Sequence, residues 1–245
     1  MVAWGALLWA MTAATRHDSP HFSPRRRWRA LETLFLIGVL SLIPSVEICP
    51  AGDARIITVP ALGVHLSQQS GTVHYILIQV DPNVQHTGPI VQFSEINFGG
   101  GSRVGPDWKD GARHAVLAAA AVAGQDPRGW TVTIKNRSFN SITDGMSASG
   151  AIAVGLLAAW RGATLRPDVA LTGTIAEDGR VLPVGGLPEK LAGAAQAHIT
   201  TVLVPRGQAR TAEWDLFELA ARRQLTVMEV GTLEEAYDVM TGSGS

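Results

Sequence analysis

Length, composition and charge limit what this chain can be. Its 245 residues are enough for one sizeable domain with an appendage, and a hydrophobic fraction of 46% can fill a buried core. The formal net charge of -1 provides no broad basic field, so sequence-independent binding to nucleic acid is not expected. The single cysteine, Cys49, cannot form an internal disulfide, and no second cysteine is present to build a zinc site with it. We expect no bound metal and no other cofactor.

Residues 1–54 differ in character from the rest of the chain. An arginine cluster at 25–29 precedes an apolar run at 34–43, and a polar stretch follows at 50–53. A basic flank before an apolar run is typical of an export signal or a membrane anchor. The run is shorter than the roughly 20 residues that span a bilayer, so a cleaved signal, a strained anchor and a buried helix all remain open. We expect a membrane-anchored or exported protein with the following domain outside the cytoplasm.

From residue 55 onward the pattern is that of a mixed α/β (α+β) domain, predicted to extend over 55–241 with a flexible tail at 242–245. Helices and strands alternate without a repeat of 20 to 50 residues, which favours such a domain over a repeat array. The strands are predicted at 56–66, 72–80, 90–93, 130–134, 169–175, 200–204 and 225–230. The helices are predicted at 107–123, 147–160, 189–197, 215–223 and 233–240. We expect 90–93 to pair with 72–80 as the return strand of a hairpin, and the glycines at 99–101 to form a turn.

Two short segments contain the residue types that chemistry needs. The first is Asp-Gly-Met-Ser at 144–147, and the second is Pro-Val-Gly-Gly-Leu-Pro-Glu-Lys at 183–190. Each has an ordinary structural interpretation by itself. The first can be a turn that caps a helix, and the second can be a turn before a helix on which Lys190 is solvated.

The choice of lysine at position 190 is itself informative. Of the 20 basic residues, only Lys109, Lys135 and Lys190 are lysines, and the others are arginines. A desolvated ammonium group can lose its proton near neutral pH, whereas a guanidinium group cannot. A lysine in an otherwise arginine-rich chain can therefore indicate acid–base chemistry, although chance explains Lys109 and Lys135 equally well.

Taken together, the two segments resemble the proteolytic domain of Lon proteases. That family carries an Asp-Gly-x-Ser motif and a downstream Pro-x-Gly-Gly-x-x-Glu-Lys motif, and Ser147 and Lys190 are 43 residues apart, as in its Ser-Lys dyad. The likeness extends over about 72–240, including the Thr-Gly that ends 168–173. This chain departs from the common pattern at a few positions, namely Met146 for proline, Ser149 for glycine, Pro188 for lysine and Thr174 for glutamate. The Ser-Ala-Ser sequence is similar to the membrane-linked branch of the family.

The resemblance implies a role for each residue of the motifs. Ser147 would be the nucleophile and Lys190 its general base, with a pKa reduced from about 10.4 to roughly 7 or 8 by burial. Thr172 would orient the lysine amine, or it is an ordinary strand threonine. Asp144, with the neighbouring Gly145 and Met146, would shape the turn rather than act as a third catalytic group. Ser149 is the rival nucleophile.

The function that the resemblance implies is hydrolysis of peptide bonds in unfolded or flexible polypeptides by a serine endopeptidase. No Gly-x-x-x-x-Gly-Lys-Ser/Thr loop is present in the sequence, so we expect the activity to be ATP-independent. The partners implied are polypeptide substrates and a homo-oligomeric ring. One alternative is a non-catalytic Lon-like interaction module working with a partner ATPase. Another is a small-molecule kinase, which the missing phosphate loop argues against.

Overall fold

The computed structural model describes residues 55–65, 69–95, 103–137 and 142–244, and all of them belong to one compact unit, 49–245. The predicted signal or anchor segment and the predicted glycine turn at 99–101 lie outside the described residues. Among the residues that are described, no helix has both the length and the apolar character needed to cross a membrane.

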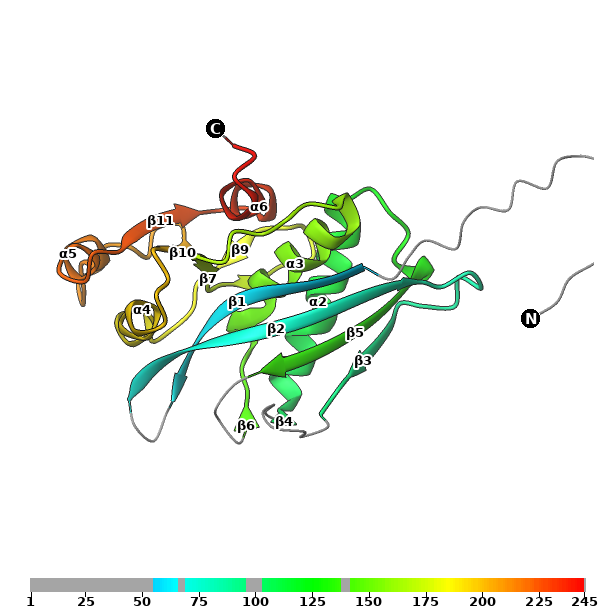
Figure 1. Ribbon diagram of the computed structural model, residues 1–245, viewed down its shortest axis with the longest axis horizontal. Helices are drawn as coiled ribbons and strands as arrows, with labels where there is room; N and C mark the ends of the chain where they lie inside the picture. The colour runs from blue at the N-terminus through cyan, green and yellow to red at the C-terminus, as the bar shows by residue number, and fades with distance from the viewer. Residues whose placement is uncertain (1–54, 66–68, 96–102, 138–141, 245) are drawn as a thin grey trace, which may run out of the picture. The chain divides into compact units, whose positions relative to one another are not determined.

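The centre of the domain is a mixed seven-stranded sheet with the order β11-β10-β7-β1-β2-β5-β3 (Figure 1). Its strands are β1 (Arg55–His65), β2 (Ser70–Pro82), β3 (Ile90–Phe93), β5 (Trp130–Arg137), β7 (Val169–Leu171), β10 (Thr201–Pro205) and β11 (Thr226–Val230). Two small ladders flank the sheet, and they join β4 (Arg103–Val104) to β6 (Ile142–Thr143) and β8 (Thr174–Ile175) to β9 (Val181–Leu182). The β2 strand pairs antiparallel with β1 and with β5, whereas the remaining neighbours in the large sheet are parallel. The predicted mixed α/β class is confirmed.

The prediction that residues 90–93 return beside β2 was wrong. The β3 strand lies at the sheet edge, where it pairs in parallel with β5, and β5 occupies the place next to β2. The reason is the length and pattern of β5, which buries every second residue and pairs with β2 over eight positions. The four residues of β3 are at most half-buried, which suits a short edge strand.

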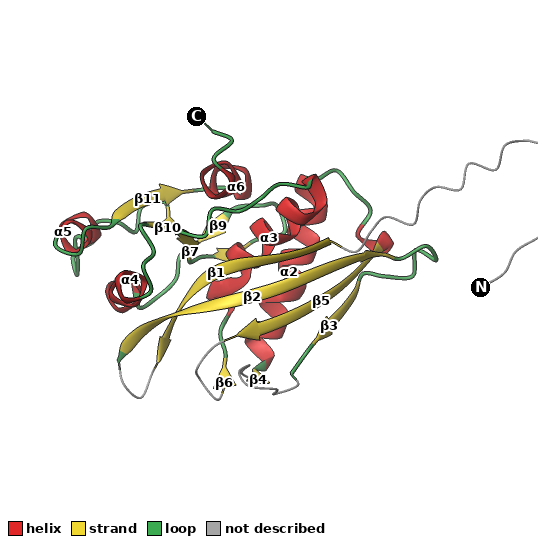
Figure 2. Ribbon diagram, viewed as in Figure 1, coloured by secondary structure: helices red, strands yellow, loops and turns green. Residues whose placement is uncertain are grey.

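Five α-helices cover the two faces of the sheet in the described part of the chain. They are α2 (Pro106–Val122), α3 (Ser149–Arg161), α4 (Leu187–Gln196), α5 (Leu216–Ala221) and α6 (Leu233–Thr241). Alternate residues of β10 divide the core, because Leu203 packs with α2, α3 and α6, whereas Val202 and Val204 pack with α4 and α5. Figure 2 shows α2 and α3 together behind the long strands β1, β2 and β5. The buried helix α3 lies at the centre of the core that it shares with α2 and α6.

Two predicted elements are interrupted in the structure. The helix predicted over 147–160 starts with a turn of 3-10 helix, η3 (Met146–Ala148), before α3 begins. The strand predicted over 169–175 divides into β7 and β8, which belong to different sheets. The break falls at Thr172 and Gly173. The backbone N–H groups of these two residues bond to Leu203 and Ser147 instead of continuing one ladder.

The position of α4 depends on a direct backbone contact with β2. Gly193 of α4 faces Gly71 of β2, and a Cβ added to Gly193 would lie 2.3 Å from the carbonyl carbon of Gly71. In the other direction, a Cβ added to Gly71 would lie 1.7 Å from the carbonyl oxygen of Glu189. No side chain fits in either place, so the two glycines set how closely α4 approaches the sheet.

We expect Gly193→Ala to lower the free energy of unfolding by about 1 to 3 kcal/mol, because the added methyl group must push α4 away from β2. Urea denaturation measures the change. Gly185→Ala is the matched control, since a Cβ at that position meets nothing within 4 Å. Equal stability of the two variants would show that the backbone contact does not fix the helix.

Candidate active site

The candidate site lies where two neighbouring parallel strands separate. In the described part of the sheet, β1 and β7 pair at Ala61↔Leu171 and not beyond it. A pocket of about 790 Å³ opens next to this point, and its walls are the end of β1 and the segments 142–148 and 183–186. Ser147 and Lys190 both line this pocket. The fold therefore brings the two predicted motifs to one cavity.

Lys190 lies in the first half of α4, and its side chain is enclosed rather than solvated. The residue is 4% exposed, and its Nζ atom donates a hydrogen bond to Thr172 Oγ1 at 3.0 Å. Burial lowers the pKa of Lys190 to about 8, and the negative charge of Glu189 opposes part of this shift. The interpretation of Lys190 as a solvated surface residue was wrong.

Thr172 follows the last residue of β7 and is fully buried. Its backbone N–H bonds to the Leu203 carbonyl at 3.1 Å, which holds it against the neighbouring strand β10. The hydroxyl that accepts from Lys190 is thus fixed by the sheet rather than by a loop. The structure places Thr172 beside the lysine amine.

Ser147 lies in η3 and is half-buried at the pocket wall. Gly145, which precedes this turn, has φ +94° and ψ 151°, a backbone conformation that residues other than glycine rarely adopt. The Ser147 carbonyl accepts a bond from the Gly173 N–H at 2.9 Å. Among the described residues, no hydrogen bond joins Ser147 Oγ to Lys190 Nζ, although both residues line the pocket.

Asp144 has a structural partner on α2. Its Oδ1 atom accepts hydrogen bonds from the Trp108 N–H at 3.0 Å and from the Gly145 N–H at 2.9 Å. A carboxylate at the start of α2 satisfies a helix N–H group and interacts favourably with the helix dipole. Gly105 makes room for it, because a Cβ there would lie 2.2 Å from Asp144 Cγ. These contacts fit a residue that shapes the turn. Met146 packs against α2 at Gly111, where an added Cβ would lie 3.2 Å from Met146 Cα.

Ser149 does not line the pocket. It is 1% exposed, and its Oγ atom accepts a hydrogen bond from the Ile175 N–H at 2.9 Å. This bond ties α3 to β8. A hydroxyl that is enclosed and engaged in this way is poorly placed to attack a substrate, which leaves Ser147 as the serine at the pocket.

Sequence reasoning missed His74 and Trp108, two buried residues of the pocket wall. His74 is 4% exposed, and burial lowers its pKa to about 4, with the Lys190 charge adding to the effect and a hydrogen bond with Asn136 opposing it. Its Nε2 atom and the Trp108 Nε1 atom are buried without a hydrogen-bond partner among the described residues. The available signal was the place of His74 in the inward-facing series of β2, at an interval of two from Ile76.

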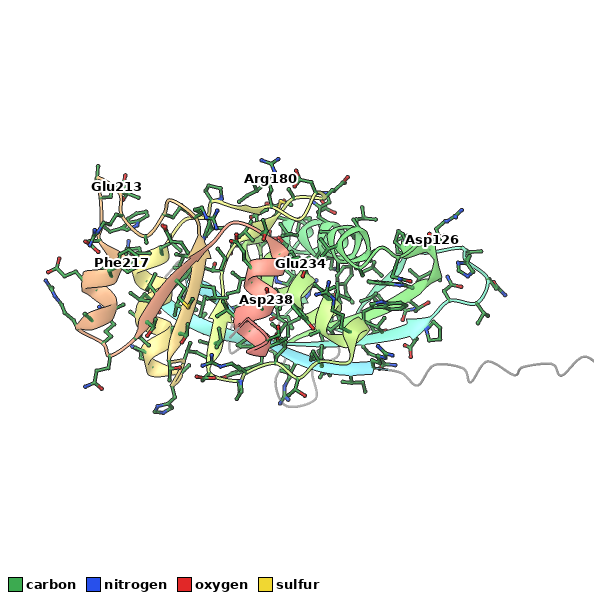
Figure 3. All side chains as sticks on the ribbon, turned by 90° about the horizontal axis from the view of Figure 1, so that it is seen from above. Asp126, Arg180, Glu213, Phe217, Glu234 and Asp238 are labelled. Carbon is green, nitrogen blue, oxygen red and sulfur yellow. The ribbon has the colours of Figure 1, made fainter. Side chains whose placement is uncertain are left out.

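Charged side chains are scarce around the pocket and common at the surface. The labelled residues Asp126, Arg180 and Glu213 lie at the periphery of the view in Figure 3, Glu234 lies on α6, and none of the four lines the pocket. Among the described residues, no group of three or more His, Cys, Asp or Glu is arranged to hold a metal ion. Apart from histidines, Asp144 and Lys190 are the charged residues that line the pocket, and burial has the largest effect on the pKa of Lys190.

Comparison with known proteins covers the region that contains both motifs. Residues 139–241 match the family model of the Lon protease (S16) C-terminal proteolytic domain. A Lon protease 2 of Herpetosiphon aurantiacus is 43% identical over 98 residues, which are 39% of this chain and 12% of that protein. A Lon protease of Aquifex aeolicus is 42% identical over 96 residues, again 39% of this chain and 12% of that protein. A mitochondrial Lon protease homolog of Yarrowia lipolytica is 33% identical over 97 residues, 40% of this chain and 8% of that protein.

Over residues 139–241 the chain is thus similar to the Lon proteolytic domain. The resemblance seen in the two motifs is thus confirmed, and this Lon-type region supports a protease function. The family match begins later than the motif-based likeness, which extended back to residue 72. The aligned part of the chain spans about one eighth or less of the curated relatives it matches.

The burial of Lys190 generates a prediction about stability. We expect Lys190→Met to raise the free energy of unfolding at pH 7 by about 1 to 3 kcal/mol, because the folded state no longer has to bury an ammonium group. Below pH 8 the lysine is charged in both states, so the gain is largest there. Between about pH 8 and the ordinary lysine pKa near 10.5, the folded wild type holds fewer protons than the unfolded chain and becomes relatively more stable. The gain should therefore shrink at pH 9.5.

Urea denaturation of both proteins at the two pH values tests this. Lys109→Met is the matched control, since Lys109 is half-exposed and lies 3.2 Å from Glu95. It should bring no such gain. A Lys190→Met protein that is less stable than the wild type at pH 7 would contradict the prediction.

Proposed function

We propose that the Lon-type domain of this chain is an ATP-independent serine endopeptidase that hydrolyses peptide bonds in unfolded or flexible polypeptides. In this proposal Ser147 is the nucleophile and Lys190 is its general base. The observation that carries the proposal is the burial of Lys190 at the same pocket as Ser147, with a pKa lowered to about 8. A lysine amine can act as a base near neutral pH only when its pKa is reduced in this way.

The chemical steps follow the usual course of acyl transfer by a serine. Ser147 Oγ attacks the carbonyl carbon of the scissile peptide bond while its proton passes to the neutral amine of Lys190. Lys190 then gives this proton to the leaving nitrogen, the C–N bond breaks, and the acyl group remains on Ser147. A water molecule next loses a proton to Lys190 and attacks the ester, which releases the acid and restores the hydroxyl group.

Two neighbouring groups support these roles. Because Lys190 Nζ donates to Thr172 Oγ1, its lone pair is free to face another direction, and the pocket lies beside it. The start of the helical segment η3 also lies at the pocket wall. Backbone N–H groups at a helix start lack intrahelical acceptors, so this turn can stabilise the oxyanion of the tetrahedral intermediate.

Substrate binding is proposed to use the edge of β1. One edge of this strand pairs with β2 along its full length, and the other pairs with β7 at Ala61. The residues of β1 after Ala61 line the pocket, and β7 does not pair with the strand edge there. An extended peptide can add to such an edge through main-chain hydrogen bonds and with broad sequence tolerance. A homo-oligomeric ring is a further proposal, which rests on the family resemblance.

The proposal predicts cleavage of unfolded casein by the purified chain without nucleotide, and loss of this activity in two variants. Ser147→Ala removes the nucleophile, and Lys190→Arg keeps the positive charge but replaces the base with a group that stays protonated. Each should lower kcat/KM by roughly 10² to 10⁴-fold. Thermal melting must first show that both variants are folded. Strict dependence on ATP would contradict independence of nucleotide, and a folded but inactive wild type would favour the non-catalytic interaction module.

The same assay has a pH dependence. Because the neutral amine is the active form, kcat/KM should rise as Lys190 loses its proton, with a midpoint near pH 8. His74 stays neutral through this range, since its pKa is about 4. A rising limb with a midpoint near 6.5 would point to a histidine instead of Lys190.

Export and membrane anchoring remain proposals, supported by the arginine cluster at 25–29 and the apolar run at 34–43. We expect the Lon-type domain to be digested when protease is added to cells whose outer layers have been removed and whose cytoplasmic membrane is intact. A cytoplasmic marker protein should stay intact under the same conditions. A domain protected to the same extent as the marker would contradict this localisation.

A further inference from the structure

The Gln208 side chain holds a segment of the pocket wall that belongs to no strand. This segment, 183–186, lines the pocket between the end of β9 and the start of α4. The Gln208 amide nitrogen donates to the Val184 carbonyl at 3.0 Å, and the Val184 N–H donates to Gln208 Oε1 at 2.9 Å. One side chain thus satisfies both main-chain groups of Val184, as a neighbouring strand would.

Gln208 is itself fixed by the elements around it. Its backbone N–H bonds to the Pro205 carbonyl at 3.1 Å, and its carbonyl accepts from Trp214 Nε1 at 2.9 Å. The next residue, Ala209, is buried and donates its N–H to Glu229 on β11 at 2.7 Å. The amide that reaches the pocket wall is therefore supported by the sheet rather than by a free loop.

The wall segment depends on this contact because little else holds it. Val184 is half-buried and packs with one layer of the core, whereas Pro183 and Gly185 on either side of it are exposed. Among the described residues, no hydrogen bond other than the two with Gln208 is found for the main chain of 183–185. A segment that contains glycine is conformationally free unless contacts restrict it.

The opposite wall of the pocket is the end of β1, and the two walls approach each other at Gly186. This glycine has φ +68°, and a Cβ on it would lie 2.7 Å from Val64 Cγ2. The exposed residue Gly185 lies between this point and Val184, which Gln208 holds. A polypeptide in the pocket therefore meets a wall whose place is set at both ends.

We propose that Gln208 is a positioning residue for the polypeptide substrate, which binds against the wall segment that the Gln208 amide holds in place. This inference rests on the proposed function, because the segment shares its pocket with Ser147 and Lys190. Gln208 does not line the pocket, so it acts through Val184. The wall is ordered before the substrate arrives, and binding does not have to supply the free energy of ordering it.

The contact should affect substrate binding rather than the chemical step. Lys190 lies on α4, whose position is set separately by the contact between Gly71 and Gly193. Ser147 is held by a bond to the residues that follow β7. Loosening 183–186 should therefore raise KM, while kcat and the pH midpoint near 8 stay unchanged.

Cleavage of unfolded casein by the full chain is the first test. Gln208→Met keeps the approximate length of the side chain and removes both hydrogen bonds. We expect KM to rise by about 3 to 10-fold, because water partly replaces the lost bonds at this half-buried site. Gln125→Met is the matched control and should leave KM unchanged, since the Gln125 amide bonds to the Ala123 carbonyl at 3.4 Å and the residue does not line the pocket. Thermal melting must show that both variants are folded.

A conservative variant separates positioning from loss of shape. In Gln208→Glu, a carboxylate still accepts from the Val184 N–H but repels the Val184 carbonyl, whereas the protonated acid can donate to that carbonyl. Binding is measured in the Ser147→Ala background, by fluorescence anisotropy of a short rhodamine-labelled peptide of alanine, leucine and serine. We expect Gln208→Glu to weaken binding by about 3 to 10-fold at pH 8 and by less at pH 4.5, where the acid is largely protonated.

Several results would overturn the inference. They are a folded Gln208→Met protein with the KM of the wild type, a change in kcat or in the pH midpoint instead of KM, and equal weakening by Gln208→Glu at both pH values. Absence of peptide binding to the Ser147→Ala protein would also overturn it. If Gln208→Met does not fold, the comparison with Gln208→Glu decides.

The failure of this inference and that of the proposed function are distinguishable. Each result above leaves the proposed function standing, provided that Ser147→Ala abolishes casein cleavage. Conversely, cleavage that survives in Ser147→Ala would remove the proposed dyad, while the binding comparison would still decide whether Gln208 positions the polypeptide.

Discussion

The dipeptide Thr172-Gly173 is the constraint on which the geometry of the site depends. Its threonine hydroxyl accepts the bond from Lys190, and its glycine exchanges two backbone bonds of 2.9 Å with the Ser147 carbonyl and the Gly150 N–H. The same dipeptide is bonded to β10 through Leu203. The turn that contains Ser147 and the helix that contains Lys190 are thus both bonded to the residues that follow β7. A Cβ on Gly173 would lie 2.5 Å from Val181, so this close arrangement has no room for a larger residue.

The burial of the lysine has a cost that the fold must offset elsewhere. An ammonium group loses hydration when α4 packs on the sheet, and the lowered pKa of Lys190 is the measure of that loss. The contact between Gly71 and Gly193 holds α4 close enough for this to happen, and Leu187 and Leu191 on the same helix are buried in the core. Stability supplied by apolar packing therefore offsets the cost of keeping the Lys190 amine buried with a lowered pKa.

Much of this arrangement could be predicted from the sequence because it depends on local patterns. Alternating apolar residues revealed β2 and β5, and the paired motifs identified the segments that reach the pocket. Pairing order could not be predicted in the same way, since β3 is placed by competition with the longer β5 ladder. The break at Thr172 could not be predicted either, because apolar and β-branched residues occur both before it, at 169–171, and after it, at 174–175. The place of His74 in the pocket wall could not be predicted either, because it depends on the space left by Gly63 on another strand.

The partner of Asp144 shows how such tertiary contacts change the meaning of a motif. In the sequence, Asp144 stands three residues before Ser147 and could belong to a catalytic group. In the fold, its carboxylate accepts from the Trp108 N–H at the start of α2, across a gap that Gly105 leaves open. This contact fixes one end of the turn, and the bond from Gly173 fixes the other end at Ser147. Because the turn is held at both ends, the Ser147 side chain can be presented at the pocket without depending on a hydrogen bond to Lys190.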